Sequence, residues 1–288
     1  MNYSRKQFLQ LGSGTIGALY FSPLVKSVSM HDDPRKLKTF GLQLYTLRDI
    51  LLNEPNNILK RVASFGYKQI ESYEGPKGMF WGMSHSDFKK TMDDLGMTII
   101  SSHCDINKDF EKKADEASSI GMKYLLSSSF GYQKKKDDYK KLSDQFNHCA
   151  KICKTAGIRF AYHGEDDDFK LREGYIPHDL FMQNSDPAFM DFQMDIYWVI
   201  TGGQDPETLL KRYPNRFRLC HIKDRIKGAT ERDASCDLGT GSIDFTRILK
   251  AAKQNGMQYY IAEQERYDGT TPMKAVEADA RFMKKLKI

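Results

Sequence analysis

The amino-acid sequence predicts a single α/β domain built as a closed (β/α)8 barrel, preceded by an N-terminal export signal. Three observations support this fold class. The chain has 288 residues, which accommodates one such barrel of roughly 250 residues and a leader. From Phe40 to the C-terminus, short apolar runs alternate with amphipathic stretches. Five of these amphipathic stretches end in a glycine that directly precedes the next apolar run.

Residues 1–30 have the pattern of an export signal, in which a basic start precedes a small-residue apolar stretch, here residues 11–25. The start resembles a twin-arginine signal, except that Lys6 stands where the second arginine would be. Several glycines and Pro23 interrupt the apolar stretch, so we expect no stable membrane span. The alternative is an N-terminal arm without an export function. We expect residues 31–39 to be a linker and the protein to be exported, with the periplasm as its location.

The apolar runs from Phe40 onward have the length and the flanking residues of buried strands. The predicted strands cover residues 40–46, 67–72, 97–103, 123–128, 158–163, 190–195, 217–222 and 258–263. Glycines separate helix from strand at Gly66, Gly96, Gly121, Gly157 and Gly256. Repeated βα units of this kind form either a closed barrel over residues 40–288 or an open doubly wound sheet. No GxGxxG turn follows the first strand, which favours the barrel.

Composition and charge are those of a globular protein with a small-molecule partner. The formal net charge is +6, but three of the 44 basic residues and none of the 38 acidic ones lie in residues 1–30, so the remainder carries only +3. The basic run Lys134–Lys136 precedes two aspartates, which is typical of a solvated helix start and not of a nucleic-acid site. The five cysteines show no CxxC spacing and are expected to be free thiols.

Side chains of the metal-ligand type follow six of the predicted strands. They are Glu71, His103, His163 with Glu165, Asp195, His221 with Lys223, and Glu263 with Glu265. In a barrel, the C-terminal ends of all strands meet at one face, so these side chains are expected to share one pocket. A mixture of imidazole and carboxylate groups suits Mn²⁺, Zn²⁺, Co²⁺ or Fe²⁺, whereas an all-oxygen set would suit Mg²⁺ or Ca²⁺.

The same residues carry a resemblance to a known family. The motifs are Asp195-x-x-Trp198, His221-x-Lys223-Asp224, Gly239-x-Gly241-x-x-Asp244-Phe245 and Glu263-Gln264. Together they resemble the sugar phosphate isomerase/epimerase superfamily of xylose isomerase-like TIM barrels, over nearly all of residues 40–288. The resemblance implies a divalent metal ion (Mn, Zn, Co, Fe or Mg) held by Asp195, His221 and Glu263.

The fifth predicted strand departs from that family pattern. His163 stands where ketose epimerases have a glutamate that both binds the metal and moves a proton. We therefore expect His163 to be the fourth metal ligand, with Glu165 as the alternative. The departure argues against the two-glutamate epimerase mechanism and leaves metal binding as the expectation.

The resemblance implies an enzyme that abstracts a proton next to the carbonyl of a sugar or keto-sugar, as an isomerase or epimerase does. The candidate catalytic residues are Glu165, Glu263 and Lys223, and Glu71, His103 and Trp198 are expected to bind substrate. One alternative is a lyase or dehydratase that eliminates a group from a keto-sugar or keto-glycoside. Another is an exported sugar-binding protein without activity. The expected partner is a small carbohydrate; no nucleic acid is expected, and a homo-oligomer stays open.

Overall fold

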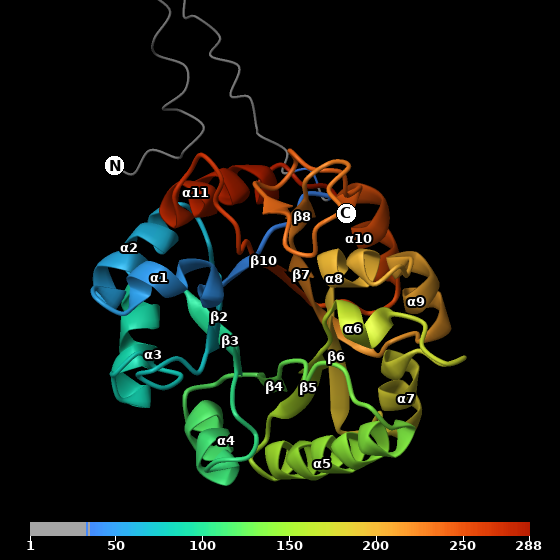
Figure 1. Cartoon of the computed structure of the whole chain (residues 1–288). Helices are drawn as coiled ribbons and strands as arrows, with labels where there is room; N and C mark the ends of the chain where they lie inside the picture. Colours follow the sequence, from blue (N-terminus) through green and yellow to red (C-terminus); the bar gives the residue numbers. More distant parts are fainter. Residues whose placement is uncertain (1–32, 34) are drawn as a thin grey trace, which may run out of the picture. The chain divides into compact units, whose positions relative to one another are not determined.

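The computed structural model describes residue 33 and residues 35–288. Residues 35–288 form one compact unit, drawn in Figure 1 with the strands in a ring and the helices outside it. The predicted export signal lies outside the described residues. The compact unit begins at Arg35 and not at Phe40, because the end of the predicted linker pairs with the C-terminal segment. The amide of Leu37 donates to the carbonyl of Leu286 at 3.0 Å, and Lys36 forms a β-bridge with Lys287.

Eight parallel strands close into a barrel in the order β1-β10-β7-β6-β5-β4-β3-β2. They are β1 (Gly41–Gln43), β2 (Gln69–Tyr73), β3 (Thr98–His103), β4 (Tyr124–Ser127), β5 (Arg159–His163), β6 (Met190–Asp195), β7 (Phe217–Ile222) and β10 (Tyr259–Ala262). Seven lie within the predicted strand segments and β2 runs one residue beyond its segment, to Tyr73, so the predicted single-domain barrel is confirmed. A short antiparallel hairpin of β8 (Asp224–Arg225) and β9 (Ser235–Cys236), which the sequence reading missed, follows β7.

Helices connect the strands and cover the outside of the barrel. They are the 3-10 helix η1 (Leu44–Leu47) and α1 (Arg48–Leu51), α2 (Pro55–Ser64), α3 (His85–Asp94), α4 (Phe110–Ser119), α5 (Lys136–Thr155), α6 (Asp166–Phe169), α7 (Pro177–Asn184), α8 (Ile196–Thr201), α9 (Pro206–Arg212), α10 (Phe245–Gln254) and α11 (Pro272–Met283). All five predicted helix-ending glycines have a positive φ, from 64° at Gly96 to 99° at Gly66, which glycine adopts without strain.

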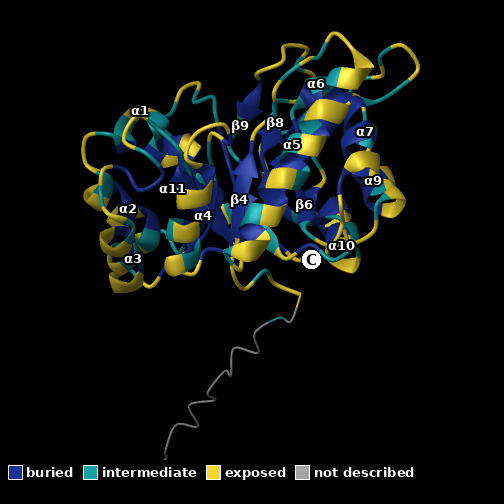
Figure 2. Ribbon diagram, turned by 90° about the horizontal axis from the view of Figure 1, so that it is seen from below, coloured by how far each residue is buried: buried dark blue, intermediate teal, exposed yellow. Residues whose placement is uncertain are grey.

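The main apolar core lies between the strands and the helices, and a small second cluster fills the inside of the barrel. Figure 2 shows the buried strands behind helices whose outward faces are exposed. The inner cluster consists of Tyr124, Leu126, Ala161, Leu219 and Ile261. Tyr124 begins β4, so this cluster lies toward the N-terminal ends of the strands. The buried side chains of the predicted site lie at the opposite, C-terminal end, whereas Asp191 binds Tyr124 and Arg159 near the N-terminal ends.

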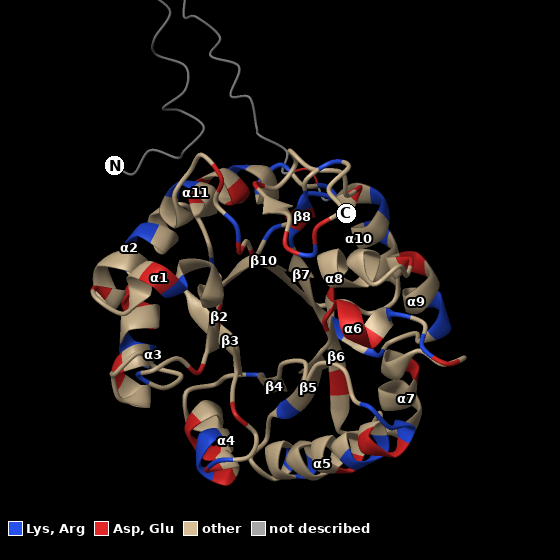
Figure 3. Ribbon diagram, in the orientation of Figure 1, with Lys and Arg blue, Asp and Glu red and all other residues tan. Residues whose placement is uncertain are grey.

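Charge on the outer helices is mixed. Figure 3 shows acidic and basic side chains interspersed over the helices, and α5 begins at the predicted lysine run, at Lys136. Within the described residues, no helix has the length and apolarity to cross a membrane. The cysteines are free thiols, as predicted, and Cys149, Cys153 and Cys220 are buried.

The loop after the β8–β9 hairpin is fixed by Asp224. The Asp224 carboxylate accepts hydrogen bonds from the amides of Gly239, Gly241 and Ile243, at 2.9, 3.0 and 3.2 Å. A Cβ atom at position 241 would collide with this carboxylate, so the approach requires glycine there. The Gly239-x-Gly241 motif thus holds the segment that borders the strand ends of β7 and β10.

One histidine is buried among aromatic rings away from the strand ends. The His178 ring lies 4.7, 5.2 and 5.6 Å from the ring centroids of Phe169, Phe192 and Phe217. Its side chain is 1% exposed, and neither ring nitrogen has a hydrogen-bond partner. Burial, with a smaller contribution from Arg216, lowers the pKa of His178 to about 3, so the folded protein holds it neutral.

This burial predicts an acid-sensitive fold. The unfolded chain protonates His178 below a pH of about 6.5 while the folded protein does not, so stability is lost as the pH falls from there toward the folded-state pKa. Between pH 7.5 and pH 5 the free energy of unfolding should fall by about 2 kcal/mol through this group. Urea denaturation at the two pH values measures this change. In His178→Leu the fall in the free energy of unfolding should be smaller than in the wild type by that amount. The exposed His148→Leu control should behave like the wild type; equal drops in all three proteins would contradict the assignment.

Candidate active site

A cavity of about 450 Å³ lies at the C-terminal ends of the strands. Its wall includes five of the predicted site residues, namely His103, His163, Glu165, Trp198 and Glu263. Three others, Glu71, Asp195 and His221, are fully buried around it, with no exposed surface. Strand β10, which Glu263 follows, pairs with β7 and with β1 and so closes the ring. Closure brings the predicted site residues together from the ends of six strands.

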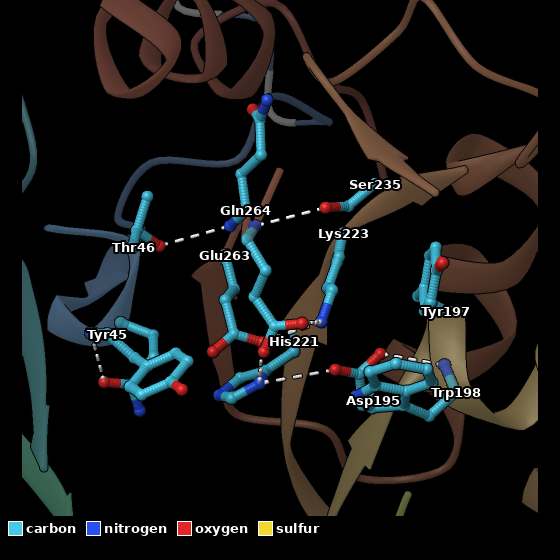
Figure 4. A network of polar contacts seen from close by, with 12 residues as sticks. Tyr45, Thr46, Asp195, Tyr197, Trp198, His221, Lys223, Ser235, Glu263 and Gln264 are labelled. Carbon is cyan, nitrogen blue, oxygen red and sulfur yellow. Dashed lines mark hydrogen bonds and ion pairs between the residues drawn. The ribbon is translucent and has the colours of Figure 1, made fainter. Parts of the chain in front are cut away.

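Asp195, His221 and Glu263 form a cluster that fits a metal ion. One ligand atom from each lies within 4.8 Å of the others. His221 Nδ1 is 3.6 Å from Asp195 Oδ2 and 3.1 Å from Glu263 Oε2. Figure 4 shows the His221 ring between these two carboxylates. Asp195 Oδ2 and His221 Nδ1 are buried without a hydrogen-bond partner, which is costly unless a cation binds them.

The local structure at the end of β6 leaves one oxygen of Asp195 free. Asp195 is the N-cap residue of α8, and its Oδ1 accepts from the Trp198 amide at 3.1 Å. This hydrogen bond fixes the carboxylate and turns Oδ2 toward His221. The Asp195-x-x-Trp198 motif is therefore a helix cap that orients a ligand atom.

Glu71 orients His221 from behind. Its carboxylate accepts from His221 Nε2 at 2.5 Å and from Gln43, Ser101 and Gln193 at 2.6 to 3.0 Å. Because Nε2 is engaged, Nδ1 faces Asp195 and Glu263. Burial raises the pKa of Glu71, but His103 and His221 outweigh it and hold that pKa well below its ordinary value. Glu71 is buried and saturated with hydrogen bonds, which favours an orienting role in place of the predicted contact with substrate.

His163 is held in a form that suits a metal ligand. Its Nδ1 lies 2.9 Å from Gln193 Oε1, an acceptor, so Nδ1 donates and Nε2 keeps its lone pair. Burial, and then His221 and His103, lower the pKa of His163 to about 3, so the ring is neutral. His163 groups with His103 and His221 in a second set whose ligand atoms lie within 4.8 Å, and Glu165 belongs to neither set. The geometry therefore favours His163 over Glu165 as the ligand from β5.

His103 is engaged at both ring nitrogens. Nδ1 is 2.8 Å from Ser128 Oγ, and Nε2 is 2.9 Å from Gln193 Oε1. Its ring stacks on that of His221 at 5.7 Å with an interplanar angle of 10°. His103 lines the cavity, and its predicted contact with substrate stays a prediction.

Glu165 faces the cavity and is paired with an arginine from the β8–β9 loop. Arg232 Nη2 is 2.5 Å from Glu165 Oε2, and Arg232 Nε is 2.7 Å from Asp166 Oδ1. Burial raises the pKa of Glu165, and the charge and hydrogen bond of Arg232 oppose that rise. A carboxylate with a raised pKa that borders the cavity has the properties of a general base.

Lys223 lies behind the cavity wall with no exposed surface. Its Nζ is 2.7 Å from Glu265 Oε2 and 3.6 Å from Glu263 Oε2. Burial lowers the pKa of Lys223, but Glu263, Asp195 and Glu265 outweigh it and raise that pKa. The ammonium is thus a fixed positive charge that neutralises cavity carboxylates, and a direct proton transfer by Lys223 to substrate is disfavoured.

Trp198 lines the cavity, but two cations already lie over its ring. Arg232 Cζ is 4.1 Å and Lys223 Nζ is 4.4 Å from the ring centroid. These cation–π contacts occupy the surface that a sugar would stack on. Substrate could therefore contact Trp198 only at the part of the ring that lines the cavity and is not covered by these two cations.

Two residues that complete the site were not singled out from the sequence. Gln193 joins Glu71, His103 and His163, and Arg232 holds Glu165. Gln193 stands two residues before Asp195 in β6, and side chains two apart in a strand share a face, so this spacing could have identified it. Arg232 lies in a loop, where spacing carries no such signal.

The chain belongs to the xylose isomerase-like TIM barrel family, whose profile matches residues 59–286. It is 31% identical to a sugar phosphate isomerase/epimerase from Parabacteroides distasonis, with a TM-score of 0.71 over 91% of this chain and 97% of that one. The predicted superfamily is thereby confirmed, and these relatives agree with the predicted class of sugar isomerase/epimerase-like enzymes.

Two further relatives are more distant. An inosose dehydratase from Geobacillus kaustophilus is 28% identical over 145 residues, which are 44% of this chain and 46% of that protein. The chain spans about half the length of the curated relatives it matches. The IolI protein with a bound zinc atom shares the fold, with a TM-score of 0.68 and 16% identity over 84% of this chain and 95% of that one.

The contact between Glu71 and His221 predicts a specific effect on metal affinity. In Glu71→Gln, His221 loses the carboxylate that fixes its ring, so affinity for Zn²⁺ or Mn²⁺ should fall by ~10–100-fold. Competition with a chromophoric chelator measures this affinity. Glu277→Gln is the matched control, since Glu277 pairs on the surface with Arg281. Unchanged affinity in Glu71→Gln would show that Glu71 has no part in orienting a ligand.

Proposed function

We propose that this protein is a metal-dependent enzyme that abstracts a proton next to the carbonyl of an uncharged sugar or keto-sugar. The observation that carries the proposal is the buried cluster of Asp195, His221 and Glu263 beside a cavity that carboxylates line. His163 is the fourth ligand in this proposal. A divalent cation bound there would polarise the substrate carbonyl and so acidify the neighbouring C–H bond.

The proton acceptor in this proposal is Glu165. Glu263 is a weaker candidate, because His221 and Lys223 outweigh the effect of burial and lower its pKa. Glu165 borders the cavity, has a raised pKa and is held by Arg232 against free rotation. Glu265 is the second carboxylate with a raised pKa in the cavity wall, and its pairing with Lys223 makes it less available. Return of the proton from Glu165 to the former carbonyl carbon, with transfer of the hydroxyl proton to the other oxygen, completes an isomerisation; return of a proton to the original carbon from the opposite face completes an epimerisation.

The proposed substrate carries no phosphate. Five carboxylate residues line the cavity, namely Glu74, Asp105, Glu165, Glu263 and Glu265, and its lining includes no lysine or arginine. An isolated phosphate group would bring about two negative charges into this surface, which repels it. A neutral sugar, recognised by hydrogen bonds to its hydroxyl groups, fits the lining better.

Elimination is the second candidate reaction. The match to inosose dehydratases favours it, because a dehydratase removes water from its substrate. The same base would act first, and a group at the cavity wall would protonate the leaving oxygen. His103 lines the cavity and is the candidate for this role, in which it would exchange its hydrogen bond to Ser128 or Gln193 for one to the leaving oxygen.

Proton exchange tests the proposal and separates the two reactions. Metal-loaded protein incubated in D₂O with keto-sugars should incorporate deuterium next to the carbonyl, observed by NMR. Exchange with all groups retained indicates isomerisation, and release of a group indicates elimination. Glu165→Gln should slow exchange by ~10²-fold or more, the size expected for loss of a general base, with metal affinity nearly unchanged. His163→Ala should instead weaken metal binding.

Two outcomes would contradict parts of this assignment. Loss of metal in Glu165→Gln with retention in His163→Ala would reverse the two roles. Absence of exchange with any keto-sugar would favour a binding protein without activity. We also propose that the protein is exported, on the basic-then-apolar pattern of residues 1–30. N-terminal sequencing of the native protein should find this segment removed, and an intact Met1 in the cytosolic fraction would contradict export.

A further inference from the structure

The cavity has a buried end and an exposed end. His163 and Glu263, at the buried end, are each only 5% exposed. The exposed end is formed by loops that follow the strands, and it includes Tyr45, Asp105 and Phe130. The proposed chemistry uses only the buried end, so the exposed end has no assigned role.

The size of the cavity exceeds that of one sugar ring. A hexose has about a dozen heavy atoms, and each occupies less than the ~30 Å³ of a liquid water molecule, because bonded atoms pack more closely. The cavity of about 450 Å³ therefore keeps unfilled space when a single ring sits at the buried end. This space lies next to the exposed loops.

Two aromatic side chains in that space stay open to solvent. Tyr45 and Phe130 are 38% and 39% exposed, and they belong to the four large hydrophobic residues that are exposed among the described residues. Each ring is supported from the side. Tyr73 packs edge-on against Tyr45 at 5.1 Å, and Phe146 lies 5.9 Å from Phe130. Arg48 Cζ lies 4.7 Å from the Tyr45 ring centroid and takes one face of that ring. The Phe130 ring therefore offers the main flat apolar surface, which suits the C–H face of a sugar.

Polar groups lie near these rings on the loop after β3, and the buried side chain of Lys113 holds this loop in place. Lys113 is 8% exposed, and its Nζ donates to Glu74 Oε2 at 2.6 Å and to the Asp105 carbonyl at 2.8 Å. Asp105 Oδ1 accepts from the amide of Asn107 at 2.9 Å. The loop thus presents a carboxylate and an amide at fixed positions, and these groups bind vicinal hydroxyls.

We infer that the exposed end of the cavity is a subsite for a second sugar ring, so that the substrate is an uncharged disaccharide or a larger glycoside. This inference rests on the proposed function, since it places the reacting ring at the metal cluster. The second ring stacks on Phe130 and donates hydroxyl hydrogens to Asp105. Its contacts raise affinity and do not take part in the proton transfer.

Calorimetric titration of the metal-loaded full chain tests the subsite. The probes are a panel of neutral disaccharides, such as cellobiose and maltose, and their component monosaccharides. We expect at least one disaccharide to bind at least ~10-fold more tightly than its own monosaccharide, because stacking and hydrogen bonds add contacts. Phe130→Ala and Asp105→Ala should each remove most of that difference and leave monosaccharide binding unchanged. Tyr132→Ala is the control, since Tyr132 is 46% exposed near Phe130 but does not line the cavity.

Two results would overturn the subsite. One is a panel in which no disaccharide binds ~10-fold better than its monosaccharide. The other is that Phe130→Ala or Asp105→Ala weakens the affinity for the disaccharide and for the monosaccharide by the same factor. Deuterium exchange on monosaccharides keeps this outcome separate from the proposed function. Deuterium exchange without a preference for disaccharides would contradict the subsite alone. A preference for disaccharides without exchange on any sugar would contradict the proposed reaction.

Discussion

The interaction on which the site depends is the buried contact of His221 with carboxylates on both sides of its ring. Glu71 accepts from Nε2, and Asp195 and Glu263 face Nδ1. Buried charges of one sign are unfavourable unless a positive charge balances them. Glu263 and Glu71 accordingly outweigh burial and raise the pKa of His221 well above its ordinary value. The same field would favour a divalent cation, so the geometry that orients the histidine also supports the proposed metal site.

The barrel makes this concentration of charge tolerable by supplying hydrogen-bond partners to Glu71, His103 and His163. Gln193 serves three site residues at once, because its amide nitrogen donates to Glu71 and its oxygen accepts from His103 and His163. The result is a network that spans β2, β3, β5, β6 and β7. Such a network holds side chains in single orientations, which the proposed proton transfer at one carbon would require.

The loops beyond the strand ends decide what reaches this network. Arg232, from the β8–β9 loop, holds Glu165 and lies over Trp198, and the Asp224 carboxylate fixes the loop that follows the hairpin. The opposite loops carry Tyr45 and Phe130. In this fold the ring of strands provides the stability of the domain, and the loops at one end of the ring provide specificity for the substrate.

The sequence by itself determined the strands and the glycines between helix and strand, and it predicted that Asp195, His221 and Glu263 gather at one face, because strand period and strand ends are local signals. The tertiary structure alone decided the role of Glu71 and placed Gln193 between three partners. Glu71 and His221 stand 150 residues apart, and Glu71 and Gln193 stand 122 apart, so no local pattern relates them. It also favoured His163 over Glu165, since both follow one strand and only the register of the closed ring sets which side chain reaches its neighbours. Local periodicity specifies which face a side chain occupies, whereas closure of the barrel specifies what it meets there.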